Sequence, residues 1–209
     1  MRFIFIALTI LISVSAFPQK IQKIDAILLK KDSKDTLNVK IKVSANLFDK
    51  TLLNEGSFCR NLIVIDTNDK TWPEEKWLKP KELDYLEFID FKGKTRIFVA
   101  RQDTGPLSKM DPLNKSLFEE LFVGEISWYR QYSLNAYDSS THESDYFIKK
   151  DKKKPIFIHL FTSHKKQLLK LAKDMPKLEP MIQALNNSDF DYDILEILKA
   201  YDDFKSNSI

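Results

Sequence analysis

Alternation of apolar and polar side chains marks the front of the chain. Residues 37–43 alternate strictly, and residues 24–28 have apolar side chains at positions 24, 26 and 28. A polar stretch at residues 31–35 separates the two runs. A period of two places the apolar side chains on one face of a strand. The pattern therefore predicts a hairpin over residues 20–44 with one buried face.

Further short apolar runs follow, each bounded by turn-forming residues. They predict strands over residues 62–65, 83–91, 95–101, 117–123, 125–132, 146–148 and 155–161. Turns are indicated between them, for example at Lys92-Gly93-Lys94 and at Gly124. Short strands with this spacing are typical of an antiparallel sandwich, roll or barrel.

The apolar period then changes from two to about 3.6. Three stripes recur at i, i+3, i+4 and i+7, starting at Leu168, Leu178 and Ile194, and each predicts an amphipathic helix. Residues 186–189 are expected to end the second helix and cap the third. The predicted fold class is α+β, with an antiparallel β-rich unit followed by a C-terminal three-helix segment.

The first sixteen residues have the pattern of a signal peptide. Arg2 precedes the apolar run Phe3–Ile12, and Val14 and Ala16 occupy the small-residue positions of a cleavage site. The run is shorter than the roughly 20 residues that span a bilayer. A cleaved signal is therefore favoured over an uncleaved anchor or a buried first strand.

These boundaries divide the chain into four parts. We predict a signal peptide at 1–16, a β-rich unit at 17–161, a helical cap at 162–204 and a frayed tail at 205–209. The cap is expected to pack on the β-rich unit as one domain. The protein is expected to be exported to the periplasm or the medium, with no transmembrane segment in the mature chain.

Composition narrows the function only slightly. The chain has 33 Lys and Arg against 30 Asp and Glu, a net charge of +3 that gives no support to nucleic-acid binding. The single cysteine, Cys59, is expected to be a half-buried apolar side chain, with a reactive thiol or an intermolecular disulfide as alternatives. The four isolated glycines form neither a dinucleotide fingerprint nor a P-loop.

The polar motifs predict no catalytic, cofactor or metal site. In an EF-hand loop that began at residue 189, the sixth position would need glycine and the twelfth glutamate, and the sequence has neither there. Helix capping by residues 189–193 is therefore favoured. His142, His159 and His164 form no zinc-binding pattern, and His159 is expected to be half-buried in a strand. Residues 139–145 contain the residue types of a catalytic triad, but a polar loop is the favoured interpretation.

Two segments are speculative interaction surfaces. Two indoles flank a polar turn, where they would stack on a sugar or anchor a protein interface unless they cover the core. A basic run on a hairpin tip would contact an anionic surface or polymer unless it is simply a solvated turn. The residues concerned are Trp72, Trp77, Lys150, Lys152, Lys153 and Lys154.

Five short motifs also follow one another along the chain in the same order as in a known family. They are Asp35-Thr36-Leu37, Leu83-Asp84-Tyr85-Leu86-Glu87-Phe88, Gly124-Glu125-Ile126-Ser127-Trp128-Tyr129, Met175-Pro176-Lys177-Leu178 and Leu195-Glu196-Ile197-Leu198-Lys199-Ala200-Tyr201-Asp202. On these motifs the chain resembles exported, uncharacterised proteins of Bacteroidetes-type bacteria. It departs from their pattern at Met175, in place of Cys, and at Asp202, in place of Asn. The resemblance implies export and an α+β layout, and it implies no activity and no site residues.

Three functional hypotheses follow. The leading one is an exported, non-catalytic binding or interaction protein of the bacterial cell envelope, with an envelope protein or a glycan as partner and no cofactor. The alternative is an envelope-directed hydrolase with an unrecognised active site, which predicts polar groups with shifted pKa values converging in a pocket. The third is a protein that assembles a larger complex through an open sheet edge.

Overall fold

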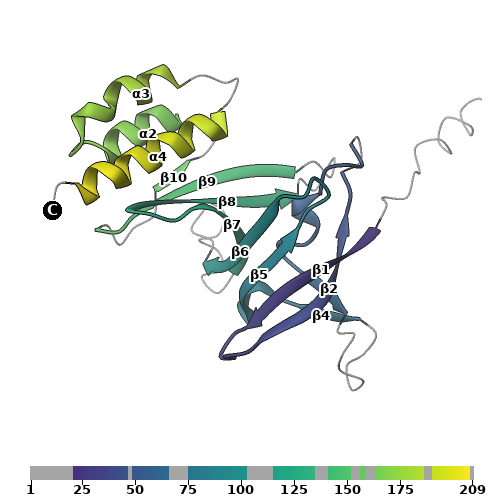
Figure 1. Cartoon of the computed structure of the whole chain (residues 1–209). Coiled ribbons are helices and arrows are strands. Elements are labelled where there is room, and N and C mark those ends of the chain that lie inside the picture. Colours follow the sequence, from purple (N-terminus) through teal and green to yellow (C-terminus); the bar gives the residue numbers. More distant parts are fainter. Residues whose placement is uncertain are drawn as a thin grey trace, which may run out of the picture.

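The fold was analysed in a computed structural model, in which the chain forms an antiparallel sheet followed by helices (Figure 1). The structure describes residues 21–46, 49–65, 75–102, 115–134, 141–151, 156–158, 163–185 and 190–207. An antiparallel sheet followed by helices confirms the predicted α+β class.

Ten strands form one continuous sheet. They are β1 (Ile21–Lys30), β2 (Thr36–Ser44), β3 (Leu62–Ile65), β4 (Lys76–Leu78), β5 (Leu83–Ile89), β6 (Thr95–Gln102), β7 (Lys115–Phe122), β8 (Ile126–Leu134), β9 (Thr141–Lys149) and β10 (Ile156–Ile158). Their spatial order is β10-β9-β8-β7-β6-β5-β1-β2-β3-β4, and every pair is antiparallel. The sheet curls into a half-barrel, so that the part around β1 and β2 crosses the part around β8 and β9 steeply (Figure 1).

The predicted hairpin is confirmed as β1 and β2. Ala26 pairs with Val39 and Leu28 with Leu37, so the alternating apolar side chains share one face. Asp32 in the connecting turn has a φ of 64°, a left-handed conformation that aspartate tolerates better than most residues.

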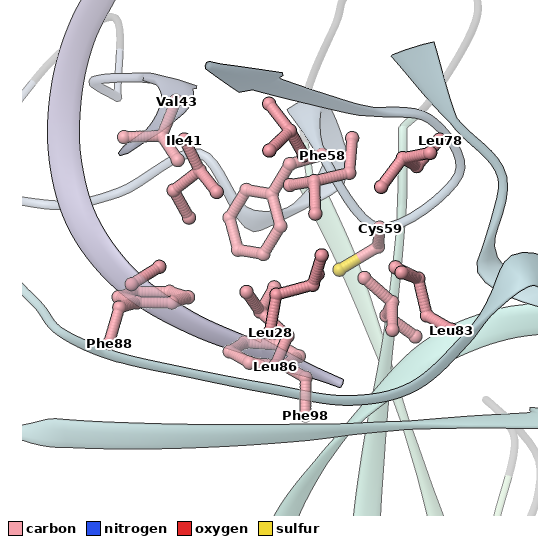
Figure 2. Packing of buried hydrophobic residues seen from close by; sticks show 14 of the residues in the cluster. Leu28, Ile41, Val43, Phe58, Cys59, Leu78, Leu83, Leu86, Phe88 and Phe98 are labelled. Carbon is pink, nitrogen blue, oxygen red and sulfur yellow. The ribbon is translucent and has the colours of Figure 1, made fainter. Parts of the chain in front are cut away.

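The curled face of β1, β2, β3, β5 and β6 encloses the first apolar core. Phe58 and Cys59 enter it from the segment after the short 3-10 helix η1 (Glu55–Ser57), and both are fully buried (Figure 2). The Phe58 ring meets Phe88 edge-on at 5.7 Å and Phe98 at 5.3 Å. Such aromatic pairs add to the burial energy and fix the packing geometry.

The helices cover the other end of the sheet. They are α2 (His164–Leu171), α3 (Glu179–Ala184) and α4 (Phe190–Ser206), and the short 3-10 helix η4 (Pro176–Leu178) directly precedes α3. Another short 3-10 helix, η2 (Pro80–Glu82), precedes β5. Their buried side chains pack with Ile126, Trp128, Phe147 and Ile158 of β8, β9 and β10 in a second apolar core. The cap therefore buries its apolar stripes against the sheet.

Two details of the predicted cap are wrong. Met181 of the second stripe is 41% exposed, because α3 is only one and a half turns long and presents Ile182 to the core. The last helix also continues to Ser206, beyond the expected start of a frayed tail at residue 205. Lys205 is part of that helix and lies 2.9 Å from the carboxylate of Asp174, which explains the extra order.

The polar-loop interpretation of residues 139–145 is also wrong from Thr141 onward. Strand β9 begins at Thr141 and pairs with β8 over its whole length, from Leu134↔Thr141 to Ile126↔Lys149. His142 and Glu143 are exposed, and Asp145 is buried against a charged partner. A strand can therefore form here without the apolar alternation that marks the others.

Gly124, between β7 and β8, lies against α4. The backbone N–H of Glu125 donates to Asp202 Oδ1 at 2.8 Å, and a Cβ on residue 124 would stand 2.1 Å from Asp202 Oδ2. Only a residue without a side chain leaves room for this contact.

We expect Gly124→Ala to lower the free energy of unfolding by about 1–2 kcal/mol, because the methyl group displaces Asp202 from the Glu125 amide. Urea unfolding measures this loss. In an Asp202→Ala background the same glycine substitution should cost less. Equal losses in the two backgrounds would contradict the role given to Asp202.

Candidate functional site

The structure separates the two predicted interaction segments. Trp77 lies in β4, at one end of the sheet, whereas Lys150 follows β9, next to the last strand at the other end. Lys150 is exposed and its ammonium lies 2.6 Å from Glu125. Trp72, Lys152, Lys153 and Lys154 lie outside the described residues. The two described members, Trp77 and Lys150, thus belong to different surfaces.

Trp77 borders a groove on the outer face of the sheet. The indole is 65% exposed, so it does not cover the core. The groove has a volume of about 280 Å³, and its lining includes Ile21, Lys42, Ser57, Arg60, Ile63 and Trp77. We call it the Trp77 groove. Its volume is near the lower limit for small-molecule pockets, about 300 Å³.

Strand register puts these side chains in one row. Lys23 of β1 pairs with Lys42 of β2, Lys42 with Ile63 of β3, and Ile63 with Trp77 of β4. Directly paired residues point to the same face of a sheet. The neighbouring residues of each strand, such as Val43, point into the first core. The same alternation that builds the core therefore exposes the Trp77 row on the other side.

The row is positively charged. Lys23 and Lys42 face each other, and Lys42 pairs with Glu75. Arg60 is exposed beside them, and neither Lys23 nor Arg60 forms an ion pair within the described residues. The next outward-facing pair differs, because Lys40 lies 2.5 Å from Asp25. Of these two neighbouring pairs, the one beside the Trp77 groove therefore carries the excess positive charge.

A second, larger groove of about 380 Å³ crosses β1, β2 and β5. Its charged side chains already have partners, since Asp25 pairs with Lys40 and Glu87 accepts a hydrogen bond from the Tyr85 hydroxyl. It has no exposed aromatic ring among its described lining residues. Of the two grooves, the Trp77 groove therefore has the stronger features of a binding site.

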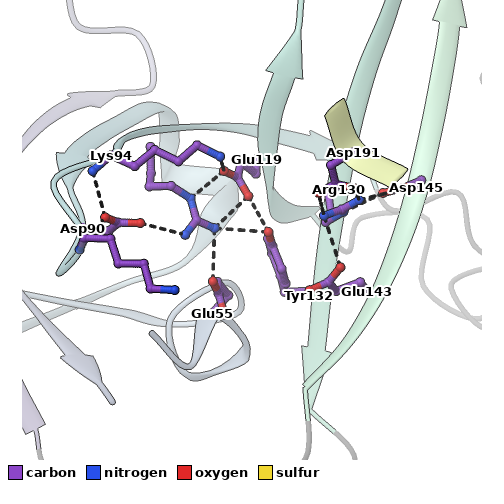
Figure 3. A network of polar contacts seen from close by, with 11 residues as sticks. Glu55, Asp90, Lys94, Glu119, Arg130, Tyr132, Glu143, Asp145 and Asp191 are labelled. Carbon is purple, nitrogen blue, oxygen red and sulfur yellow. Dashed lines mark hydrogen bonds and ion pairs between the residues drawn. The ribbon is translucent and has the colours of Figure 1, made fainter. Parts of the chain in front are cut away.

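Charged side chains form a belt of two clusters, one around Arg96 and one around Arg130 (Figure 3). Nη2 of Arg96 donates to Glu119 at 2.7 Å and to Glu55 at 3.1 Å, and Nη1 donates to Asp90 at 3.4 Å. The hydroxyl of Tyr132 donates to Glu119. Burial raises the pKa of Glu55, and the Arg96 charge opposes this shift. Arg96 is thereby held among three carboxylates.

Arg130 joins the sheet to the cap in the same belt. Nε donates to Asp145 of β9 at 2.8 Å, and Nη1 and Nη2 each donate to Asp191 of α4 at 2.8 Å. Glu143 lies 3.2 Å from Nη1. Two-point hydrogen bonding of this kind fixes orientation as well as charge. The guanidinium therefore fastens the start of α4 to β8 and β9.

His164, the first residue of α2, contacts the same cluster. Its Nε2 lies 2.7 Å from Asp145 Oδ2, and the ring meets Phe190 edge-on at 4.6 Å. Burial alone would raise the pKa of Asp145, but hydrogen bonds from His164 and Arg130 outweigh it and lower the pKa. The ionised carboxylate can only accept, so Nε2 carries the proton.

A His–Asp pair is also two thirds of a catalytic triad. Catalysis by acyl transfer would require a hydroxyl or thiol within hydrogen-bond reach of the other imidazole nitrogen. Within the described residues His164 hydrogen-bonds only to Asp145. The two grooves described above lie on β1–β5 and not beside His164. The contacts of Arg130 and His164 thus tie β8 and β9 to α2 and α4.

Asp174, which follows α2, links the C-terminal end of α4 to β9. Its carboxylate lies 2.8 Å from Lys149, 2.9 Å from Lys205 and 2.9 Å from the Tyr201 hydroxyl. Its modest burial would raise the pKa, but these three contacts lower it well below the usual range. The folded protein therefore keeps this carboxylate charged into strong acid.

We expect the free energy of unfolding to fall as the pH is lowered from about 5 to about 2. A carboxylate with a lowered folded pKa stabilises the fold above its unfolded pKa of about 3.9, and this contribution disappears as the pH passes through the folded pKa. Asp174→Asn should flatten the profile measured by urea unfolding at several pH values. Asp203→Asn, which removes an exposed acid of α4, is the control. Equal slopes in the two variants would contradict the assignment to Asp174.

Cys59 is fully buried rather than half-buried as predicted, and it packs as an apolar side chain in the first core. Burial and the nearby Glu55 and Glu119 raise the pKa of the thiol well above its usual range. The thiol is therefore protonated and inert at neutral pH.

No group of three His, Cys, Asp or Glu in the described ranges is arranged to hold a metal ion. Likewise, none of the helices in the described part of the chain is long and apolar enough to cross a membrane. No family model, curated protein or solved structure matches the chain. Function therefore has to be inferred from the geometry of the described residues.

Proposed function

We propose that this chain is an exported, non-catalytic binding protein of the bacterial cell envelope, and that the Trp77 groove is its binding site. The observation that carries the proposal is the exposed indole of Trp77 in a groove that also holds Arg60, a cation with no ion pair within the described residues. Exposing a Trp costs burial energy unless a partner covers the ring. The signal-peptide pattern of residues 1–16 supports export, as does the resemblance to exported Bacteroidetes-type proteins.

Export is tested by where the protein is found and by its N-terminal sequence. Expression of the tagged full-length chain in its host should yield a periplasmic or secreted protein whose N-terminal sequence starts at Phe17. Recovery in the cytoplasm with residues 1–16 attached would contradict export.

Binding is tested by cross-linking and affinity capture of the same protein. We expect a partner to be recovered at high occupancy and lost with Trp77→Ala. Tyr192→Ala is the matched control, because Tyr192 is 64% exposed on α4, at the other end of the sheet. A partner lost equally from both variants, or recovered equally with both, would count against the Trp77 groove.

The His164–Asp145 contact favours a second candidate, an envelope-directed hydrolase. It would use the imidazole as a general base oriented by Asp145. Hydrolysis of envelope material that disappears with His164→Ala, while Trp77→Ala retains it, would replace the binding proposal. Absence of His164-dependent turnover would remove this candidate.

A further inference from the structure

Lys42, which lines the Trp77 groove, and Lys23, its partner on β1 beside the groove, are paired at an electrostatic cost. Like charges placed directly opposite each other on neighbouring strands are destabilising. Lys23 and Lys42 have this arrangement, and Glu75 compensates only one of the two charges. Arg60 adds a further cation at the groove. An anionic ligand would relieve this repulsion.

The remaining surface of the groove is aromatic and apolar. Trp77 is 65% exposed and Ile21 is 61% exposed. Ile63 lies between Lys42 and Trp77 in the same row. A flat indole can pack against a flat ligand ring while neighbouring polar groups hydrogen-bond to its rim. The ligand is therefore expected to have both an apolar ring face and negative charge.

Hydrogen-bonding capacity separates two anionic ligand classes. The side chains that line the groove include the donors of Lys42, Arg60, Asn61 and Ser57, and no carboxylate is among the described lining residues. Added peptide strands hydrogen-bond along a sheet edge, where donors and acceptors alternate. The Trp77 groove instead lies on the face of four strands and offers an excess of donors. An acceptor-rich ring fits this surface better than an extended acidic peptide.

Building on the proposed function, we infer that the Trp77 groove binds an acidic saccharide. One sugar ring would pack on the Trp77 indole, and its carboxylate, sulfate or phosphate group would be held by Arg60 and the Lys23–Lys42 pair. Guanidinium groups suit such anions because they offer paired donors. Lys42 is half-buried and already pairs with Glu75, so the cations of this site without an ion pair within the described residues are Arg60 and Lys23.

Titration calorimetry with the protein produced from its full coding sequence tests this inference. The probes are polygalacturonate as the acidic saccharide, dextran as a neutral one and poly-glutamate as an acidic peptide. We expect polygalacturonate to bind and to weaken with added salt. Trp77→Ala and Arg60→Glu should each reduce the affinity by about tenfold or more. The controls Tyr192→Ala and Lys173→Glu, both on the cap, should retain it.

Other outcomes overturn the inference in different ways. Equal binding of dextran would remove the requirement for negative charge, and equal or tighter binding of poly-glutamate would make the groove a peptide site. Failure of all three polymers, with a Trp77-dependent protein partner still captured from the host, would end the saccharide inference and leave the proposed function standing. Failure of both experiments would end both.

Discussion

Arg96→Ala is expected to lower the free energy of unfolding by about 3–5 kcal/mol, the usual cost of removing one partner from a buried ion pair. The reason is the carboxylate left behind, because the side chain of Glu119 is only 3% exposed. Glu55 and Asp90 would lose the same cation, and both are themselves largely buried. Urea unfolding followed by circular dichroism measures the loss.

Two comparisons isolate the buried charge. Lys40→Ala breaks the exposed pair with Asp25 and should cost less than about 1 kcal/mol. Arg96→Met combined with Glu119→Leu should recover part of the stability, since it removes the most buried of the carboxylates that lose their cation, whereas Glu55 and Asp90 remain. A loss in Arg96→Ala no greater than that in Lys40→Ala would show that the charged belt is hydrated rather than buried.

Leu198→Ala should lower the free energy of unfolding by about 2–5 kcal/mol. Leu198 is fully buried in α4 and packs in the second core with Trp128 and Phe147 of the sheet. Removing its side chain leaves a cavity that helix and sheet cannot both close. Tyr192→Ala, on the exposed side of the same helix, is expected to change stability by about 0.5 kcal/mol or less.

The same experiment tests whether the cap and the sheet form one domain. We expect a single transition, because the second core is built by the helices and β8–β10 together. Far-ultraviolet circular dichroism and tryptophan fluorescence should then give coincident curves for the parent and for Leu198→Ala. An early loss of helical signal, with the sheet still folded, would make residues 162–204 a separate unit.

Strand positions could be predicted where burial is one-sided. Val39, Ile41 and Val43 alternate with polar residues, and the structure buries these three side chains. The partners of a strand could not be predicted in this way, because a period of two specifies a face and not a neighbour. The placement of β5 beside β1 is therefore visible only in the structure. The start of β9 at Thr141 could not be predicted, because the first residues of this strand contact solvent or pair with charged side chains and show no apolar alternation.

The charged belt was missed for a related reason. Glu119 lies two residues from Leu117 and two from Leu121, at a position where the strand period calls for an apolar side chain. Arg130 stands in the same way between Trp128 and Tyr132. Charges at core positions are the available signal. Their partners, Arg96 and Asp145, come from other strands, so only the register of the sheet brings them together.

The sheet order also has a consequence for synthesis. A chain emerges from the ribosome or the translocon with its N-terminus first, so β1 and β2 can pair early. Strand β1 has a second neighbour, β5, which emerges only after β3 and β4. Until then one edge of β1 remains open, with unpaired backbone groups that attract other strands. Newly synthesised chains are thus prone to aggregation between the emergence of β2 and that of β5, the interval in which a chaperone would be most effective.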